Sequence, residues 1–207
     1  MKNITVIGLG SMGYGIAQSL IRSGYNVYGQ DKNTAQQKKL IEEGGLDAEI
    51  PFGDLDAVII VVLNEAQTRD IIFGEEGIAD KLKKHTLVIV CTTVSPNFAK
   101  EMATACENKE LLYLDAPISG GSIKSSQGKL SYMVSGSKNA LVAAKPILDS
   151  TSETVFEFGE VVGSGSAMKA VNQMLAGVHI AAMAEAITFG ITQGIEPERF
   201  LEVISKC

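Results

Sequence analysis

A glycine-rich turn near the N-terminus constrains the fold of this chain more than any other feature. The β-rich run Ile4–Ile7 leads into Gly8-Leu9-Gly10-Ser11-Met12-Gly13, and a helical stretch follows. Glycines spaced in this way between a strand and a helix are typical of a tight turn beside a dinucleotide pyrophosphate. The helix that follows offers free N–H groups to the phosphates. The turn therefore predicts a dinucleotide site, with the alternative that the glycines serve packing alone.

Short apolar runs alternate with helical runs along most of the chain. Seven consecutive apolar residues, 57–63, are typical of a parallel strand that is covered on both faces. Such alternation predicts an α/β fold, a doubly wound Rossmann-type sheet that is mostly parallel. The expected strands are Ile4–Ile7, Val27–Gln30, Ala57–Leu63, Leu87–Val90, Leu111–Leu114, Leu130–Val134 and Thr154–Phe158.

A change in the residue pattern near residue 163 predicts a second domain. From Ala167 to Gly190 the chain is helical in pattern and apolar nearly all round, so this helix needs other helices around it. We expect residues 1–162 to form the dinucleotide-binding domain, and residues 163–207 to form the first long helix and the start of a truncated all-α domain. Several polar residues inside the helix argue against a membrane span: Asn172, Gln173, His179 and Glu185.

Composition excludes several classes of protein. The 207 residues carry 18 Lys and Arg against 24 Asp and Glu, and this acidic balance argues against a nucleic-acid partner. Three cysteines without a CxxC pair indicate a reducing compartment, and the N-terminus lacks a signal-peptide pattern, so we expect a cytoplasmic protein. With only two histidines, no metal site is expected.

Asp31 suggests which dinucleotide is bound. It ends the second expected strand, 18 residues after Gly13. A carboxylate there accepts hydrogen bonds from ribose hydroxyls and repels a 2′-phosphate. No arginine follows, and Lys32 is the one nearby cation. These residues predict NAD rather than NADP, with the alternative that Asp31 caps the helix that begins near Thr34.

Two further segments are candidates for chemistry. Ser119, Gly120 and Gly121 follow an expected strand at the edge where ligands gather, and their N–H groups and hydroxyl suit a carboxylate. Ordinary loop chemistry is the alternative. Lys169 lies in the first turns of the apolar helix, where an unpaired lysine is costly. Burial beside a nicotinamide lowers a lysine pKa and so favours proton transfer; otherwise the side chain reaches out to solvent.

Three motifs in order resemble the β-hydroxyacid dehydrogenase family: Gly8–Gly13, Asp115–Gly121 and Gly163–Lys169. That resemblance implies that Lys169 is the catalytic acid/base, and that Ser119, Gly120 and Gly121 hold the substrate carboxylate. It also implies a set of cofactor contacts, namely Gly8, Gly10, Ser11, Met12, Gly13, Asp31, Leu63, Asn64 and Thr93.

Two departures from the family pattern matter. The family usually has an asparagine four residues after the lysine, whereas this chain has Gln173, preceded by Asn172. The run from Lys169 onward resembles the L-threonate dehydrogenase branch, so both amides are expected near the substrate. His179 is available to a polyhydroxylated acid, although we expect a core histidine. The resemblance also implies a longer helical domain with a further lysine near the nicotinamide, of which we expect these 207 residues to hold only the start.

The resemblance implies hydride transfer between NAD and a small hydroxy acid or sugar acid, with L-threonate as the best match. Alternatives within the family are 3-hydroxyisobutyrate dehydrogenase and tartronate semialdehyde reductase activities. An alternative of another class is a truncated, inactive NAD-binding module. The expected partners are the hydroxy acid and a second copy of the chain, bound through the helical segment, with no nucleic acid and no membrane.

Overall fold

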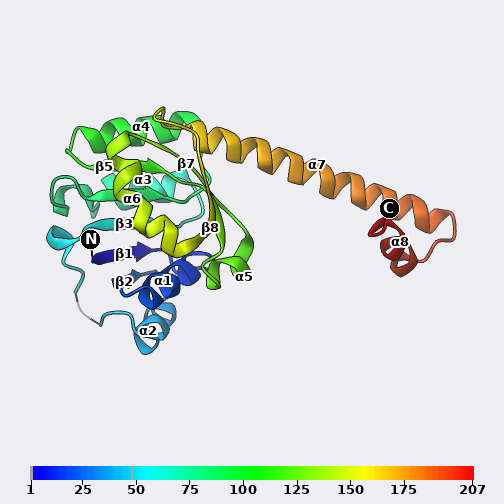
Figure 1. Cartoon of the computed structure of the whole chain (residues 1–207), viewed down its shortest axis with the longest axis horizontal. Coiled ribbons are helices and arrows are strands. Elements are labelled where there is room, and N and C mark those ends of the chain that lie inside the picture. The colour runs from blue at the N-terminus through cyan, green and yellow to red at the C-terminus, as the bar shows by residue number, and fades with distance from the viewer. Residues whose placement is uncertain (1, 48) are drawn as a thin grey trace. The chain divides into compact units, whose positions relative to one another are not determined.

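The computed structural model describes residues 2–47 and 49–207 (Figure 1). The chain divides into two compact units, Met1–Lys169 and Ala170–Cys207. All eight strands and the helices α1 to α6 belong to the first unit. The remainder of the long helix and a short final helix make up the second unit.

An eight-stranded, mostly parallel sheet forms the centre of the first unit, as the alternating pattern predicted. Its strand order is β2-β1-β3-β4-β5-β7-β6, with β8 paired to β7. Strands β1 to β5 are parallel, whereas β7 runs antiparallel to β5 and β6 and parallel to β8. The strands are β1 (Asn3–Ile7), β2 (Asn26–Gln30), β3 (Ala57–Ile60), β4 (Leu87–Val90), β5 (Leu112–Asp115), β6 (Ile118–Ser119), β7 (Leu130–Gly136) and β8 (Ser152–Glu157).

The register of the parallel strands sets up one edge of the sheet. Ile7 pairs with Gln30 on one side and with Ile60 on the other. Ile60 in turn pairs with Val90, and Val90 pairs with Asp115. Five carboxyl ends therefore lie in one row, and the loops that leave them meet at a common edge, which is where open α/β sheets bind ligands.

Helices cover both faces of this sheet (Figure 1). Helices α1 and α6 pack with Ile59 and Ile89, while α3 and α4 pack on the opposite side with Val58 and Val88. The alternation follows from the period of two along a strand. The helices of this unit are α1 (Gly13–Arg22), α2 (Thr34–Glu42), α3 (Glu65–Phe73), α4 (Pro96–Glu107), α5 (Gly121–Ser126) and α6 (Lys138–Thr151), and the 3₁₀ turns are Phe52–Asp54 and Ala79–Lys81.

Local sequence explains where several of these helices begin. The Asn64 side chain accepts a hydrogen bond from the Gln67 N–H at the start of α3. Ser95 caps α4 in the same way, and Pro96 follows it at the first helical position. Ser137 caps α6. Such side chains satisfy backbone donors that the first turn of a helix leaves without partners.

Strand β3 is shorter than the expected strand Ala57–Leu63, which was wrong at its C-terminal end. Regular pairing ends at Ile60, and the Val62 N–H donates instead to the Thr92 hydroxyl at 3.3 Å. Leu63 is 86% exposed. The apolar run continues because it enters a loop at the ligand-binding edge, and apolar patterning alone does not mark where such a strand ends.

Helix α7 (Ser164–Thr192) begins in the first unit and continues into the second, where α8 (Pro197–Ile204) follows it. It begins three residues before the expected Ala167. Apolar side chains remain exposed along the second unit, among them Met174, Val178 and Ile180. By length and composition alone α7 is able to cross a membrane, a test that the core helix of a soluble protein also passes.

Helix α5 packs directly on α1 and is hydrogen-bonded to it. The Ser125 hydroxyl donates to the Met12 carbonyl at 2.5 Å, and Arg22 donates to the Ser126 carbonyl at 2.7 Å. Gly15 allows this approach, because a Cβ there would lie 2.5 Å from the Ser125 hydroxyl oxygen and 2.6 Å from the Ser126 nitrogen. The loop before α5 is thereby tied to the helix that follows the glycine turn.

Gly15→Ala is expected to lower the free energy of unfolding by about 1–3 kcal/mol, because the added methyl forces α5 away from α1. Gly10→Ala is the matched control, since a Cβ at Gly10 meets no atom within 4 Å. Urea denaturation followed by circular dichroism measures both. Equal midpoints for Gly15→Ala and the wild type would show that the two helices do not pack as described.

Candidate active site

The glycine turn combines two kinds of glycine. Gly8 has φ +93°, and its N–H donates to the Gln30 carbonyl at 2.8 Å. A Cβ on Gly8 would collide with the Val61 carbonyl, and one on Gly13 with the Gly8 carbonyl. Around Gly10, by contrast, the space is open. The outer two glycines therefore serve the packing of the backbone, while Gly10 leaves room for a ligand to approach.

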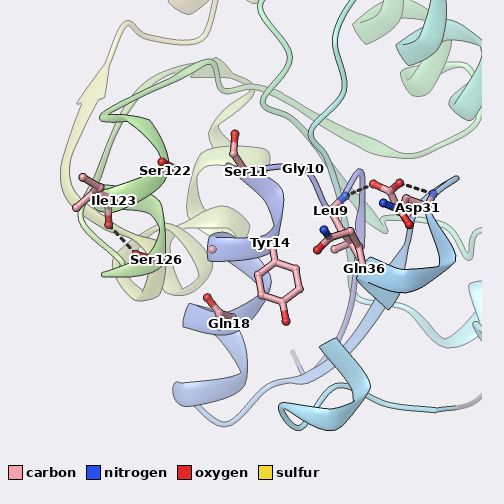
Figure 2. A pocket seen from close by; sticks show the side chains of 12 residues that line it. Leu9, Gly10, Ser11, Tyr14, Gln18, Asp31, Gln36, Ser122, Ile123 and Ser126 are labelled. Atoms are coloured by element: carbon pink, nitrogen blue, oxygen red, sulfur yellow. Dashed lines mark hydrogen bonds between the residues drawn. The ribbon is translucent and has the colours of Figure 1, made fainter. Parts of the chain in front are cut away.

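Two cavities flank this turn, and Gly10 and Asp31 line both. One measures about 510 Å³ and lies among α1, α5 and the start of α2, as Figure 2 shows. The other measures about 440 Å³ and is lined by the ends of β1 and β2, the loop after β3 and helix α3. Both volumes fall within the range of small-molecule sites. An elongated ligand that crosses Gly10 would reach both cavities.

The start of α1 suits a negatively charged group. No side chain caps this helix, which begins at Gly13. Within the part of the chain that the structure describes, the N–H groups of Ser11 and Met12 donate to no protein acceptor. Unpaired N–H groups and the helix dipole together attract a phosphate. The backbone thus fits the pyrophosphate of a dinucleotide.

Asp31 is fixed beside the turn by two backbone amides (Figure 2). Its carboxylate accepts from the Leu9 N–H at 2.6 Å and from the Asn33 N–H at 2.7 Å. Each oxygen retains a lone pair that a ribose hydroxyl is able to use. The alternative that Asp31 caps the next helix is wrong, because the cap of α2 is Asn33.

The other expected cofactor residues lie along the same edge but do not all meet. Leu63 lines the second cavity together with Gly8 and Asp31. Asn64 lies outside both cavities, and its side chain caps α3. Thr93 is exposed in the loop after β4 and lines neither cavity. Their expected contact with the cofactor stays a prediction.

The loop from Ser119 to Gly121 joins β6 to α5. Gly120 has φ +131° and Gly121 has φ +72°, conformations that side-chain-bearing residues rarely adopt. Neither glycine lines the two cavities, but α5, which starts at Gly121, contributes Ser122 and Ile123 to the first. This candidate substrate loop is therefore adjacent in the chain to one wall of that cavity.

Lys169 is buried near the start of α7, with only 7% of its surface exposed. Burial lowers its pKa from the ordinary value of 10.5, as expected from the sequence. A lysine with a lowered pKa is neutral over a wider pH range, so it accepts a proton more readily.

Asn172 and Gln173 lie on the part of α7 that belongs to the second unit. Asn172 is half-buried and Gln173 is exposed. Their substrate contact remains a prediction from helical spacing. His179 is exposed on the same helix, so the expectation of a core histidine is wrong for this chain. A second copy or further helices would be needed to bury it.

Sequence reasoning missed several residues of the first cavity: Tyr14, Gln18, Gln36, Ser122 and Ser126. Tyr14 and Gln18 are four residues apart and therefore share one face of α1. Polar residues at that spacing beside a glycine turn were a usable signal. Nothing in the sequence marked Gln36 or the serines of α5, because they reach the cavity only through the folded packing of α1, α2 and α5.

The described residues contain no group of three or more His, Cys, Asp and Glu side chains arranged to hold a metal ion. Cys91 and Cys106 are buried free thiols, and burial raises their pKa. Both thiols are thereby kept protonated. The groups that line the two cavities are instead backbone amides, hydroxyls, side-chain amides and carboxylates.

Comparison with known families covers nearly the whole chain. Residues 3–159 match the NAD binding domain of 6-phosphogluconate dehydrogenase. Residues 163–207, which include α7, match the family described as NAD-binding of NADP-dependent 3-hydroxyisobutyrate dehydrogenase. The long apolar helix is therefore part of a recognised dehydrogenase domain.

Curated relatives agree with these matches. L-threonate dehydrogenase from Cupriavidus necator is 39% identical over 99% of this chain and 70% of its own length. The enzyme of the same name from Haemophilus influenzae is 42% identical over 98% of this chain and 69% of its own length. A 3-hydroxyisobutyrate dehydrogenase from Pseudomonas aeruginosa is 32% identical over 100% of this chain and 70% of its own length.

A solved structure shows the same fold. The crystal structure of 3-hydroxyisobutyrate dehydrogenase from Salmonella typhimurium superposes with a TM-score of 0.93 at 37% identity, covering 100% of this chain and 73% of that one. The 3-hydroxyisobutyrate dehydrogenase of Mycobacterium tuberculosis gives a TM-score of 0.87 at 27% identity, covering 100% and 71%.

Gly10→Ala is expected to weaken NAD binding about tenfold, or roughly 1.4 kcal/mol, because the methyl occupies the space through which a phosphate approaches. Isothermal titration calorimetry measures the affinity, and thermal unfolding checks that the fold is intact. Unchanged affinity in a folded variant would place the dinucleotide elsewhere.

Proposed function

The chain belongs to the NAD(P)-dependent hydroxyacid dehydrogenases, the family of the 3-hydroxyisobutyrate and L-threonate dehydrogenases, and on this premise we propose that it transfers hydride between NAD and L-threonate. Sequence identity supports this choice of substrate. The chain is 39% and 42% identical to two L-threonate dehydrogenases but 32% identical to the P. aeruginosa 3-hydroxyisobutyrate dehydrogenase. Substrates of 3-hydroxyisobutyrate dehydrogenase and tartronate semialdehyde reductase are the runners-up.

In the proposed reaction, different residues of the chain bind the substrate and the cofactor. Ser119, Gly120 and Gly121 hold the substrate carboxylate and so orient the alcohol carbon. Such positioning supplies several kcal/mol of barrier reduction. When bound, NAD supplies the acceptor for the hydride. The N–H groups at the start of α1 hold the phosphates, while Leu63, Asn64 and Thr93 contact the rest of the cofactor.

Lys169 moves the proton in this proposal. As the C–H bond breaks and its electron pair leaves with the hydride, the neutral amine accepts the hydroxyl proton and a carbonyl forms. In the reverse direction the ammonium returns that proton to the oxygen. Burial suits the first role, because it disfavours the charged form of the lysine. Oxidation accordingly needs a pH high enough to leave Lys169 neutral.

Asp31 supports the choice of NAD over NADP. Its carboxylate is held in place by the Leu9 and Asn33 amides, so it cannot easily turn away from a ribose 2′ position. A 2′-phosphate there would meet a fixed negative charge and be repelled. A larger kcat/KM with NADP than with NAD would contradict this part of the proposal.

Lys169→Ala is expected to lower kcat about 10²–10⁴-fold while leaving the Kd for NAD within twofold. Lys169→Arg should be equally impaired, because a guanidinium stays protonated. In the wild type, kcat for oxidation should rise with pH and level off below pH 10.5. Stopped-flow NADH formation with L-threonate measures these values.

Lys145→Ala is the control for that experiment, since this lysine is exposed on α6 and pairs with Asp149. Near wild-type turnover in Lys169→Ala would contradict the role of Lys169. NAD binding without turnover on any of a panel of hydroxy acids would instead favour the inactive binding module.

We also propose a cytoplasmic homo-oligomer that associates through the helical segment. Apolar side chains such as Met174, Ile180 and Phe189 are each at least 63% exposed along α7, which is more apolar surface than monomers usually leave uncovered. Multi-angle light scattering is expected to give a mass above the 22.0 kDa of one chain. A single species at the monomer mass would contradict this association.

A further inference from the structure

Asp115 is a fully buried carboxylate at the end of β5, and it holds the beginning of α7. One oxygen accepts from the Ser166 hydroxyl at 2.6 Å. The other accepts from the Ser166 N–H at 2.9 Å, from the Gly163 N–H at 3.2 Å and from the Ser135 hydroxyl at 2.9 Å. Every partner donates a hydrogen, which suits a carboxylate that only accepts.

A second link extends this network. The Ser135 hydroxyl, on β7, also accepts from the Gly165 N–H at 3.1 Å. Two sheet residues together therefore satisfy three backbone amides at and just before the first turn of α7. These are donors that a helix cannot satisfy internally, and a negative charge at a helix N-terminus is stabilising.

Glycines let the beginning of the helix come close enough to be held. A Cβ on Gly165 would collide with the Met133 carbonyl and lie 3.2 Å from the Asp115 carboxylate. Gly163 has φ +95°, and a Cβ there would lie 2.7 Å from the Pro96 carbonyl oxygen. The start of α7 is thus packed against β7 and the beginning of α4, with no room for a side chain at either position.

The same carboxylate is linked to both candidate catalytic segments, to one through its hydrogen bonds with Ser166 and to the other along the chain. Lys169 lies three residues after Ser166, which is just under one helical turn. Ser119 lies four residues after Asp115, in the loop that leaves β5. A change in the attachment of Ser166 therefore moves the lysine relative to the sheet from which the substrate loop leaves.

We infer that Asp115 is a positioning residue, whose carboxylate holds the first turn of α7 so that Lys169 is placed for proton transfer beside the Ser119–Gly121 loop. This inference rests on the proposed role of Lys169. Asp115 itself is fully buried and lines neither of the two cavities. Its effect on the reaction is indirect and passes through Ser166.

The test compares Asp115→Asn and Ser166→Ala with Asp149→Asn. Asp149 is an exposed aspartate on α6 and supplies the same chemical change at a site without buried contacts. Ser166→Ala removes the hydroxyl donor but keeps the Ser166 N–H bond, so its effect should be smaller than that of Asp115→Asn. It also serves as the second variant should Asp115→Asn fail to fold.

The first measurement needs no turnover. Amine labelling with acetic anhydride, followed by peptide mass spectrometry, reports the accessibility of Lys169, with the exposed Lys100 on α4 as the internal reference. We expect Lys169 to label at least fivefold faster in Asp115→Asn, and faster to a smaller degree in Ser166→Ala. An unchanged labelling rate in both folded variants would overturn the inference, whatever the activity of the chain.

The second measurement separates positioning from a merely structural role. With L-threonate and NAD, at a temperature well below unfolding, kcat should fall at least tenfold in Asp115→Asn, while the KM for NAD stays within twofold. An unchanged kcat with reduced thermal stability would show that Asp115 only stabilises the fold. Turnover retained in Lys169→Ala would instead refute the proposed role of Lys169. The labelling result would still show whether Asp115 holds the first turn of α7.

Discussion

The burial of the Asp115 carboxylate is the constraint on which the rest of the site depends. A buried polar group is costly unless hydrogen-bond partners surround it, and among the described residues the donors to Asp115 come from Ser135 and from the start of α7. The chain therefore cannot place β5 and α7 independently. Lys169 lies on the second turn of that helix, so the hydrogen bonds of Asp115 with Gly163 and Ser166 also determine its position.

The parallel sheet supplies the second half of the arrangement. Its register brings the carboxyl ends of five strands into one row, so the glycine turn, Asp31 and the loop after β5 leave from one edge. The contact of α1 with α5 then links the helix that follows the glycine turn to the candidate substrate loop through Gly15 and Ser125. The candidate cofactor and substrate segments are consequently connected through packed elements of the first unit.

Motif spacing was enough to predict the sheet, the glycine turn and the candidate residues Asp31 and Lys169. Those features depend on local chemistry, such as a glycine where a Cβ would collide. The Asp115 contacts with Ser166 join residues 51 positions apart, and the wall formed by Gln36 and Ser122 requires three packed helices. Neither leaves a local pattern. The end of β3 was misjudged for a related reason, since an apolar residue in a ligand-edge loop looks like one in a strand.

In the proposed reaction the buried amine of Lys169 exchanges a proton with the substrate hydroxyl. A crystal structure of the protein with NADH and a non-reactive threonate analogue would test it directly. We predict that Lys169 Nζ lies within about 3.2 Å of the oxygen that loses its proton, which is the reach of a general base. An Nζ that points away from a correctly bound analogue, with no water between them, would contradict the claim.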